Sequence, residues 1–421
     1  MLEMIKVYLL FCLFFFLDRV TRKEKKYWAF SVHHIKGDQF IENQRALFHQ
    51  VKYDASIRKV IFTRDRGVTS LDVDVDTVNY EIVYLLSWRA MKILSKCGVI
   101  FVSHSIAMDY SIRFARGGFT FVRPAMNKRC VINLWHGIAM KALYALANDK
   151  VRNKTDRVPF RRYERKKYSG FITSSVVDSH AMTTMFHPIH CSQMWVTGLP
   201  RYDFLKKTVS KLPEYIKSQV DSIESMKSIL GKRVVLYAPT YRNSKVISGV
   251  DYYCFSDDEV ERLKELLNKN DAVLAFRMHY FKNEGLTNSY TRFIDNETFF
   301  DFGHEVFNDI TAPVRCADVI ITDYSSIMFD AIFMDKQYIN FCFDMDSYIN
   351  VQEGLVYDPC LLLSPTCANN FDELVTSLNS ILSGETSIVK QTHVEHLKHM
   401  FFKYTDDNNS ERIVNKIEAQ Q

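Results

Sequence analysis

The stretch Asp318–Asp330, DVIITDYSSIMFD, contains residues whose types and spacing could bind an anion. A short β-branched run precedes a polar tetrad and then apolar residues at helical spacing, which predicts a strand, a tight turn and a helix. Such a turn points the first N–H groups of the helix outward, beside the hydroxyls of Ser325 and Ser326. The pattern therefore predicts a phosphate site. Simple capping of the helix by either serine is the alternative, because a cap uses the same local physics.

Polar side chains also follow three other apolar runs that we expect to be strands. An imidazole has a pKa suited to proton transfer near neutrality, and a hydroxyl with a guanidinium can hold a phosphate. Ligands of doubly wound sheets bind at the carboxyl ends of the strands, so we expect a phosphate-handling cleft there. A lone histidine, however, is more often structural. The residues are His136 in LWHGIAMK, Thr240 and Arg242 in YAPTYR, and Arg277 and His279 in FRMHY.

Apolar runs of strand length alternate with helical stretches, which predicts βαβ units and parallel sheets. We expect two doubly wound domains, residues 27–207 and 208–385, facing each other across a cleft, and a helical tail over 386–421. The first domain should contain strands Tyr27–Val32, Arg58–Thr63, Gly98–Ser103, Cys130–Leu134, Gly170–Ser174 and Met194–Thr197, and helices Asp38–Val51, Tyr80–Lys96 and Ile138–Asn148. The second should contain strands Arg233–Ala238, Ala272–Arg277 and Gln337–Phe341, and helices Leu212–Leu230, Asp257–Asn270 and Phe371–Leu382.

Composition narrows the class of protein. The chain has 421 residues, 47% of them hydrophobic, which is enough to bury more than one core. A formal charge of +5 is small for this length, so a nucleic-acid binder is not favoured. Nine scattered cysteines without a C-x-x-C pair argue for a reducing compartment and against a disulfide framework or a zinc site.

Residues 1–26 form an apolar and then basic segment. Val7–Leu17 is almost wholly apolar but too short to span a bilayer comfortably, since a spanning helix needs ~20 apolar residues. A signal peptide is not indicated, because the positive charge follows the apolar run. We expect a monotopic membrane anchor with a basic collar against anionic lipid, and a buried first helix is the alternative. The collar is Arg19, Arg22, Lys23, Lys25 and Lys26.

Taken together, the motifs resemble the CDP-glycerol glycerophosphotransferases, a family that includes teichoic acid primases and polymerases and related capsule polymerases. The resemblance covers Leu134–Tyr357, with a looser match around Asp38–Leu47 and in the N-terminal segment. It rests on LWHG with Lys141, TGLPRYDFL (Thr197–Leu205), YAPTYR, RMHY, DVIITDYSSIMFD, and FDMDSY followed by Glu353-Gly354.

The resemblance implies a GT-B-type fold and a peripheral location on the cytoplasmic face of the membrane. It also implies transfer of glycerol phosphate or ribitol phosphate from a CDP-polyol to a hydroxyl of a lipid-linked or growing polymer, with release of CMP. His136 is the implied general base, and His279 the implied partner of the donor pyrophosphate. The other implied donor-binding residues are Thr240, Arg242, Arg277, Asp323, Ser325 and Ser326.

The family usually has Thr-Pro after the His-Gly and often proline after the second histidine. Here Ile138-Ala139 and Tyr280 occupy those positions. These departures put acceptor fit and loop shape in doubt, but they leave both histidines in place. A CMP-sugar transferase of the sialic-acid type and a non-catalytic membrane-bound protein are the rival hypotheses. A preference for a CDP-polyol donor would exclude the CMP-sugar transferase. Loss of transfer on replacing His136 or His279 would exclude the non-catalytic protein.

A dense basic run lies between Lys150 and Lys167. We expect this surface and Lys141 to face anionic lipid or a polyanionic poly(polyol phosphate) product, and an ordinary solvated helix face is the alternative. Nucleic acid is disfavoured, because no recognition module accompanies the charges. The residues are Arg152, Lys154, Arg157, Arg161, Arg162, Arg165, Lys166 and Lys167.

Two acidic clusters could suggest a metal. In LDVDVD, valines alternate with acids as on an edge strand, so solvent exposure explains the acids better, and FDMD falls within the family pattern. We therefore predict no metal bound by the protein. Mg²⁺ bridging the donor pyrophosphate stays an open alternative. The acids are Asp72, Asp74, Asp76, Asp344 and Asp346.

Overall fold

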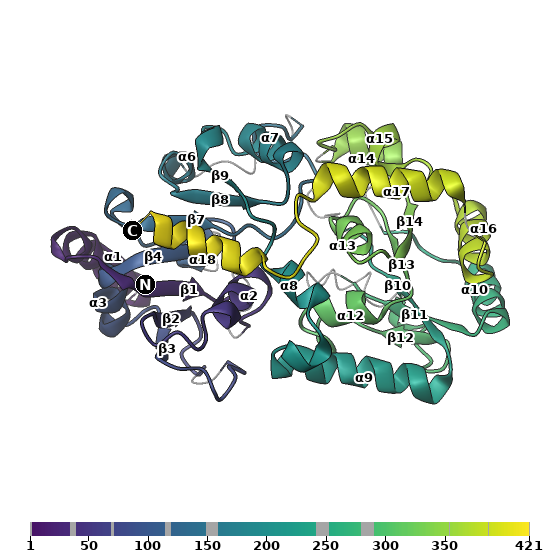
Figure 1. The fold of residues 1–421 in the computed structure, drawn as a ribbon, viewed down its shortest axis with the longest axis horizontal. Helices are drawn as coiled ribbons and strands as arrows, with labels where there is room; N and C mark the ends of the chain where they lie inside the picture. The colour runs from purple at the N-terminus through teal and green to yellow at the C-terminus, as the bar shows by residue number, and fades with distance from the viewer. Residues whose placement is uncertain are drawn as a thin grey trace. The chain divides into compact units, whose positions relative to one another are not determined.

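The chain divides into two compact units, each built around a parallel sheet, and the prediction of an α/β fold is confirmed (Figure 1). The computed structural model describes residues 2–33, 39–68, 71–113, 119–148, 159–240, 252–278, 290–352, 354–385 and 387–420. The first unit comprises Met1–Gly137, Asp156–Lys207 and Asp406–Gln421, and the second comprises Ile138–Thr155 and Thr208–Thr405.

The sheet of the first unit has the strand order β3-β2-β1-β4-β7-β8-β9. Its described pairings are all parallel, and β4 is buried along its whole length, as expected for a sheet covered on both faces. The carboxyl ends of the strands therefore share one edge. The strands are β1 Glu24–Ser31, β2 Arg58–Thr63, β3 Tyr80–Tyr84, β4 Cys97–Val102, β7 Cys130–Asn133, β8 Gly170–Thr173 and β9 Met194–Val196.

The helices of the first unit pack around this sheet. Helix α1 lies beside α3, and α18 packs on α2 and α8 (Figure 1). A short antiparallel pair, β5 Ser111–Arg113 and β6 Phe119–Phe121, lies outside the main sheet. The helices are α1 Leu2–Val20, α2 Glu42–Gln50, α3 Trp88–Lys96, α4 Ile106–Asp109, α6 Pro159–Arg165, α7 Val176–Met185, α8 Arg201–Lys206 and α18 Asn409–Ala419, with 3-10 turns η1 Met126–Lys128 and η2 Cys191–Gln193.

The six strands predicted in this unit are confirmed to within a few residues, but the helix predicted over Tyr80–Lys96 is wrong in its first part. Tyr80–Tyr84 is strand β3, which pairs in parallel with β2 because its β-branched and aromatic residues fit a sheet. The helix begins only at Trp88, after Ser87, whose hydroxyl accepts the Ala90 N–H at 3.0 Å. Helix α2 likewise begins at Glu42 rather than at residue 38.

Helix α1 has two different faces. One is buried through Val7, Phe11 and Phe14, as the alternative interpretation required. The buried face ends at Asp18. This side chain is fully buried, forms an ion pair with Arg129 and accepts a hydrogen bond from the Lys23 ammonium at 2.9 Å. The opposite face exposes apolar side chains to solvent. These are Met4, Ile5, Tyr8, Leu9, Leu13, Phe15, Phe16 and Val20.

Among the described helices, none combines the length and the hydropathy needed to cross a membrane. This finding includes α1, whose 19 residues contain the apolar stretch of the N-terminus.

The sheet of the second unit has the strand order β12-β11-β10-β13-β14-β15, again with parallel pairings. The four strands predicted here are confirmed. The two short outer strands were not predicted, because three and two residues are too few to show a periodic pattern. The strands are β10 Arg233–Tyr237, β11 Ala272–Phe276, β12 Phe299–Asp301, β13 Val319–Thr322, β14 Gln337–Phe341 and β15 Cys367–Ala368.

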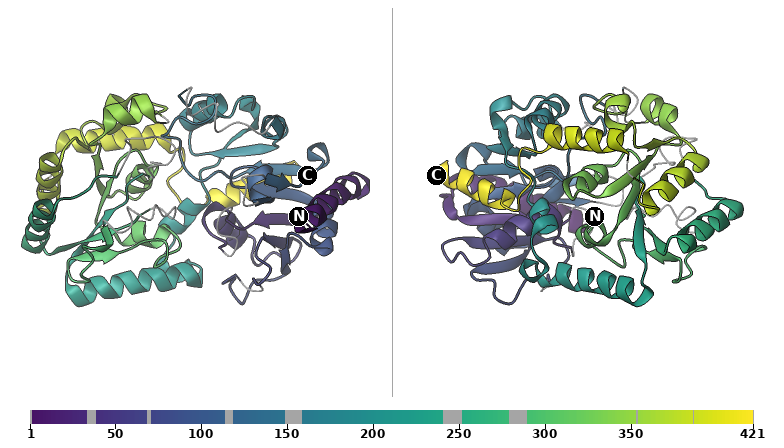
Figure 2. Two further views of the ribbon diagram at one scale, coloured as in Figure 1. Left: turned by 180° about the vertical axis from the view of Figure 1, so that it is seen from behind. Right: turned by 45° about the vertical axis from the view of Figure 1, so that its right-hand side comes forward.

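Helices of the second unit pack in pairs, α9 beside α12, α10 beside α16 and α13 beside α17, as the views from other sides also show (Figure 2). The predicted helices at α9, α10 and α16 are confirmed. The helices are α9 Glu214–Leu230, α10 Asp257–Lys269, α12 Thr311–Cys316, α13 Ile327–Phe333, α14 Met345–Val351, α15 Pro359–Leu363, α16 Phe371–Leu382 and α17 Ile388–Phe401, with the 3-10 turn η3 Val209–Lys211.

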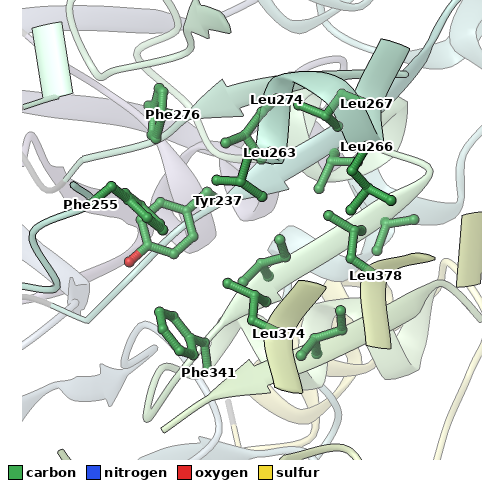
Figure 3. Packing of buried hydrophobic residues seen from close by; sticks show 14 of the residues in the cluster. Tyr237, Phe255, Leu263, Leu266, Leu267, Leu274, Phe276, Phe341, Leu374 and Leu378 are labelled. Carbon is green, nitrogen blue, oxygen red and sulfur yellow. The ribbon is translucent and has the colours of Figure 1, made fainter. Parts of the chain in front are cut away.

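An apolar core joins α10 and α16 to the second sheet (Figure 3). Leu263 and Leu267 of α10 and Leu374 of α16 pack in one cluster with Tyr237 and Phe276 of the strands. All are nearly inaccessible to solvent, so this core fixes the strand ends that precede the predicted donor-binding residues.

The acidic stretch LDVDVD is not an edge strand, so that part of the prediction is wrong. Asp74 accepts the Lys52 ammonium at 2.9 Å and lies 3.3 Å from His49 Nδ1. Burial alone would raise the pKa of Asp74, but the hydrogen bonds from His49 and Lys52 lower it well below its usual range. These contacts give the acid a structural role.

Candidate functional site

Strand β7 leads into the turn that carries His136. Trp135, directly before it, has φ of 45°, a left-handed conformation that is unfavourable for a bulky residue. The Trp135 N–H donates to Asn133 Oδ1 at 2.9 Å, and Asn133 Nδ2 donates to the His104 carbonyl at 3.1 Å. A buried asparagine thus holds this conformation and links it to the turn after β4.

Asn43 of α2 holds the same turn with two further hydrogen bonds and ties it to Arg201 with a third. Its side chain is only 1% exposed. Its Nδ2 donates to the carbonyls of Leu134 and Trp135, both at 2.9 Å, and its Oδ1 accepts the Arg201 N–H at 2.9 Å. Asn43 was not predicted from the sequence, because one asparagine within a helical pattern has no distinctive spacing. Only the looser family match around residues 38–47 pointed to this region.

The His136 ring lies among other rings. It is tilted against Trp135 with centroids 4.1 Å apart, and it stacks on His104 at 5.0 Å with an interplanar angle of 27°. Burial, together with the nearby charges of His33, Arg161 and Arg64, lowers the pKa of His104 to about 3. His104 is therefore neutral near pH 7 and can support His136 without charge repulsion.

Two carboxyl groups fix the turn that carries His104. Asp109 Oδ2 accepts the N–H groups of Ser103 at 2.7 Å and of His104 at 2.9 Å. Glu164 Oε1 accepts the Ile106 N–H at 2.9 Å and the Tyr168 hydroxyl at 2.7 Å. Burial raises the pKa of Glu164 to about 7. Neither residue was singled out from the sequence, because the contacts join positions up to 58 residues apart.

The chain after Gly137 is not helical, and the helix predicted over Ile138–Asn148 is wrong. Lys141 forms an antiparallel bridge with Leu355, and Ala142 donates its N–H to the Gly354 carbonyl at 2.9 Å. Most of the apolar residues that suggested a helix, including Ile138, Met140 and Ala142, are buried in this non-helical segment instead. The backbone of Lys141 therefore has a structural role within the second unit.

The basic run divides into residues with different surroundings. Arg165 is buried, donates to the His187 carbonyl at 3.1 Å and packs over the Phe186 ring. Arg162 and Lys166 are exposed, whereas Arg161 is half-buried and its charge acts on His104. Only part of the run can therefore serve as a surface patch. Arg152, Lys154 and Arg157 lie outside the described residues.

The predicted strand, turn and helix around Ser325 and Ser326 are present as β13, residues 323–326 and α13. Both serines are half-exposed. Ser326 occupies the N-cap position but makes no capping side-chain hydrogen bond, and Ser325 Oγ accepts the Ile327 N–H only at 3.4 Å. Within the described residues, the backbone N–H groups of Ser325 and Ser326 donate to no protein acceptor. The turn thus has the donors that an anion requires, and capping accounts for it poorly.

Asp323 and Thr240 support this turn. Asp323 is 2% exposed, and its Oδ1 accepts the N–H groups of Thr240 and Tyr324, both at 2.7 Å. The carboxylate thereby joins the ends of β10 and β13. Tyr324 in turn stacks on Tyr348 of FDMDSY, with centroids 3.9 Å apart. These contacts explain the spacing of three family motifs as parts of one buried support.

Arg277 follows β11 and donates through Nη1 to the carbonyls of Phe302 and Phe307, at 2.8 Å for Phe302. This part of its guanidinium fixes the segment after β12. His279 and Arg242, the remaining donor-side residues predicted from the sequence, lie outside the described residues.

The TGLPRYDFL motif positions the last helix of the chain. Gly198 has φ of 79°, and a Cβ there would meet Asn409 Oδ1 at 1.8 Å, so only glycine fits. Asp203 accepts the N–H groups of Asn409 at 2.8 Å and Ser410 at 2.9 Å, which caps the start of α18. Burial raises the pKa of Asp203 to about 6. This motif is therefore structural, although its Arg201 N–H also holds Asn43.

In the part of the chain that the structure describes, no group of three or more histidine, cysteine, aspartate or glutamate side chains could hold a metal ion.

Comparison with known proteins places the chain among glycerophosphotransferases. The family model described as CDP-Glycerol:Poly(glycerophosphate) glycerophosphotransferase matches residues 13–419. Teichoic acid ribitol-phosphate polymerase TarK of Staphylococcus aureus is 29% identical over 361 residues, which cover 84% of this chain and 63% of that protein. Teichoic acid poly(glycerol phosphate) polymerase of Bacillus spizizenii is 26% identical, covering 76% of this chain and 75% of the relative.

Among solved structures, the wall teichoic acid polymerase TagF has a TM-score of 0.69 with 17% identity, covering 96% of this chain and 92% of that chain. This similarity concerns the fold. The chain spans 63%, 53% and 43% of the length of three ribitol-phosphate polymerases that it matches.

Proposed function

We propose that this chain, which belongs to the CDP-Glycerol:Poly(glycerophosphate) glycerophosphotransferase family, transfers a polyol phosphate from a CDP-polyol to a polymer hydroxyl and releases CMP. The acceptor is a growing or lipid-linked cell-surface polymer of the teichoic acid type. The observation that carries the proposal is His136, held at the carboxyl edge of the first sheet on a turn fixed by two buried asparagines. Both glycerol and ribitol phosphate remain candidate groups, because the relatives are named for both.

In the proposed reaction, His136 accepts the proton of the acceptor hydroxyl. The oxygen of that hydroxyl attacks the phosphorus that carries the polyol. A new P–O bond forms, and the bond from that phosphorus to the bridging oxygen of the pyrophosphate breaks. CMP leaves with the bridging oxygen. The stacked, neutral His104 keeps the His136 ring oriented, and the positive-φ turn presents it at the strand end.

The turn at Ser325 and Ser326 is proposed to hold the donor pyrophosphate through its N–H groups and hydroxyls. His279 and Arg242 keep their predicted roles beside that pyrophosphate. If Mg²⁺ accompanies the donor, it would be carried by the pyrophosphate oxygens, and none of the proposed steps depends on it.

The exposed face of α1 is proposed to dock on an anionic membrane surface on the cytoplasmic side. Leu9, Phe16 and Val20 are 65%, 67% and 81% exposed, although they belong to a helix whose other face is buried. Among the basic residues that follow α1, Arg22, Lys25 and Lys26 are exposed. An apolar face with an adjoining basic collar is the chemistry that binds anionic lipid.

Donor and product analysis tests the reaction. The purified chain is incubated with CDP-glycerol, CDP-ribitol and a CMP-sugar, with a polyol-phosphate oligomer as acceptor, and CMP and extended product are measured by mass spectrometry. We expect CMP and extension with a CDP-polyol alone. Transfer from the CMP-sugar would support the rival sugar transferase, and release of CMP from none of the donors would contradict the proposal.

Flotation with anionic liposomes tests the membrane proposal. Leu9→Asp with Phe16→Asp should move the protein from the liposome fraction to the soluble fraction. Ile229→Asp is a matched control, because Ile229 of α9 is 84% exposed but lies far from α1 in the sequence. Equal binding of wild type and the double variant would show that α1 does not mediate docking.

A further inference from the structure

Four adjacent strands of the first sheet are each followed by a histidine or arginine. In the order β2-β1-β4-β7, these residues are Arg64, His33, His104 and His136, one to three positions after the strand ends. The strands are parallel, so the four side chains lie along one edge of the sheet. Three strand spacings of ~4.8 Å make this row about 14 Å long, which extends well beyond a single reacting hydroxyl.

Contacts hold the row together. Arg64 donates through Nη1 to the Met108 carbonyl at 3.0 Å and through Nη2 to the His33 carbonyl, so it bridges the segment after β1 and helix α4, which follows β4. The His104 ring stacks on His136 at 5.0 Å. All four members of the row are partly exposed, so a ligand can reach them from solvent.

Arg64 gives the row a guanidinium, which carries a permanent positive charge. Arg161 of α6 adds a second guanidinium, since its charge acts on both His104 and Glu164. Of the nearby acids, Asp109 accepts two backbone N–H groups and lies 3.5 Å from His104 Nδ1. Glu164 accepts a backbone N–H and a tyrosine hydroxyl, and its pKa of about 7 leaves it partly protonated at neutral pH. Both of these carboxyl groups therefore already bind other donors.

We propose that this row binds the phosphodiester of the acceptor that is nearest to its reacting hydroxyl. The proposal rests on the proposed function and adds a substrate determinant to it. His136 accepts the proton of the terminal hydroxyl, while Arg64 and Arg161 hold the preceding phosphate, with the imidazoles of His33 and His104 beside it. Acceptors that end in a polyol phosphate should then be preferred over neutral acceptors with the same terminal polyol.

Two acceptors test the preference. One carries its terminal polyol through a phosphodiester and the other carries the same polyol through a neutral ether. With the full chain and the active CDP-polyol, we expect kcat/KM to be about tenfold or more higher for the phosphodiester acceptor. Arg161→Gln should remove most of this preference by raising KM for the phosphodiester acceptor, and Arg161→Lys should restore part of it.

Arg64→Gln should have the same effect, and Arg58→Gln is its matched control. Arg58 lies at the amino end of the same strand and pairs with Glu81, so its replacement should leave the preference unchanged. Equal kcat/KM for the two acceptors in wild type, or an equal loss with both acceptors in the arginine variants, would overturn the proposal.

A binding measurement separates this proposal from the proposed function. Glycerol phosphate is titrated by calorimetry in the absence of donor, into a Ser325→Ala/Ser326→Ala background that weakens the donor-side turn. Binding that persists there and is lost on adding Arg161→Gln supports the row as an anion site even if no donor releases CMP. Binding that Arg161→Gln and Arg64→Gln leave unchanged overturns it, even if transfer occurs.

Discussion

The two turns proposed to do the chemistry are built in different ways. The turn at Ser325 and Ser326 is local, because a strand, four polar residues and a helix follow one another within residues 319–333. The turn at His136 is assembled from distant parts of the chain, since Asn43 is 91 and 92 residues away from the carbonyls that it holds. The serine turn is proposed to bind through its own backbone, whereas the His136 turn depends on buried side chains that position a single imidazole.

This difference predicts how each turn should fail. Changes at the serine turn should weaken donor binding and leave the fold intact, because the half-exposed hydroxyls make few protein contacts. Changes around His136 should lower kcat. Those that remove a hydrogen bond from its buried supports should also lower the free energy of unfolding, because the groups left unpaired lie in a region closed to water.

The largest effect is expected from His136→Ala. Loss of a general base should lower kcat by about 10²–10⁴-fold, with a small change in KM for the CDP-polyol. Steady-state CMP release measures both constants. His180→Ala, an exposed histidine on α7 of the same unit, is the matched control and should retain wild-type rates. A His136→Ala enzyme with a kcat close to that of wild type would exclude His136 as the base.

A smaller but still large effect is expected from Asn43→Asp. The carboxylate can still accept the Arg201 N–H, but it presents no amide donors to the carbonyls of Leu134 and Trp135. We expect the free energy of unfolding to fall by about 1–3 kcal/mol and kcat to fall by about tenfold or more, with KM for donor unchanged. Urea denaturation and CMP release measure these quantities.

Asn350→Asp is the control for that variant, because Asn350 is exposed in the second unit. If Asn43→Asp lost stability but kept the wild-type kcat at a temperature where it is folded, Asn43 would support the fold alone and would not position His136.

The serine turn gives the opposite signature. Ser325→Ala with Ser326→Ala should raise KM for the CDP-polyol by about tenfold, since hydrogen bonds to a charged group contribute about 1.5–3 kcal/mol. The free energy of unfolding should change by less than about 0.5 kcal/mol. Ser256→Ala is the matched comparison, because Ser256 does cap α10 within a capping box and its loss should lower stability by about 1 kcal/mol without affecting KM. A stability loss in the double variant equal to that of Ser256→Ala would favour simple capping.

The same contrast explains what could be predicted from the sequence. Strand β14 and helix α16 were predicted with their observed bounds, because their patterns are local and uninterrupted. The helix predicted over residues 138–148 is absent, because backbone hydrogen bonds to residues 354–356, more than 200 positions later, override its helical spacing. Asn43 and Glu164 could not be found for a related reason, since their function lies in contacts that only the folded chain creates.

The smallest effect on transfer, and the sharpest test of the buried support around His136, is expected from Glu164→Gln. In the unfolded chain this carboxyl loses its proton near its ordinary pKa of 4.5, whereas burial raises the pKa in the folded chain to about 7. Between these values the folded state binds more protons, so the free energy of unfolding of wild type falls as pH rises through this window. Glutamine cannot ionise but keeps an acceptor for the Ile106 N–H. Urea denaturation should therefore show that the free energy of unfolding of the variant increases by on the order of 1–3 kcal/mol relative to wild type between about pH 4.5 and pH 8.

Glu261→Gln, at an exposed position of α10, should show no such increase. A difference between Glu164→Gln and wild type that stays constant over this range would mean that the carboxyl is not held in its protonated form. The His104 turn would then rest on an ionised Glu164 side chain, in addition to the Asp109 side chain, which accepts two backbone N–H groups.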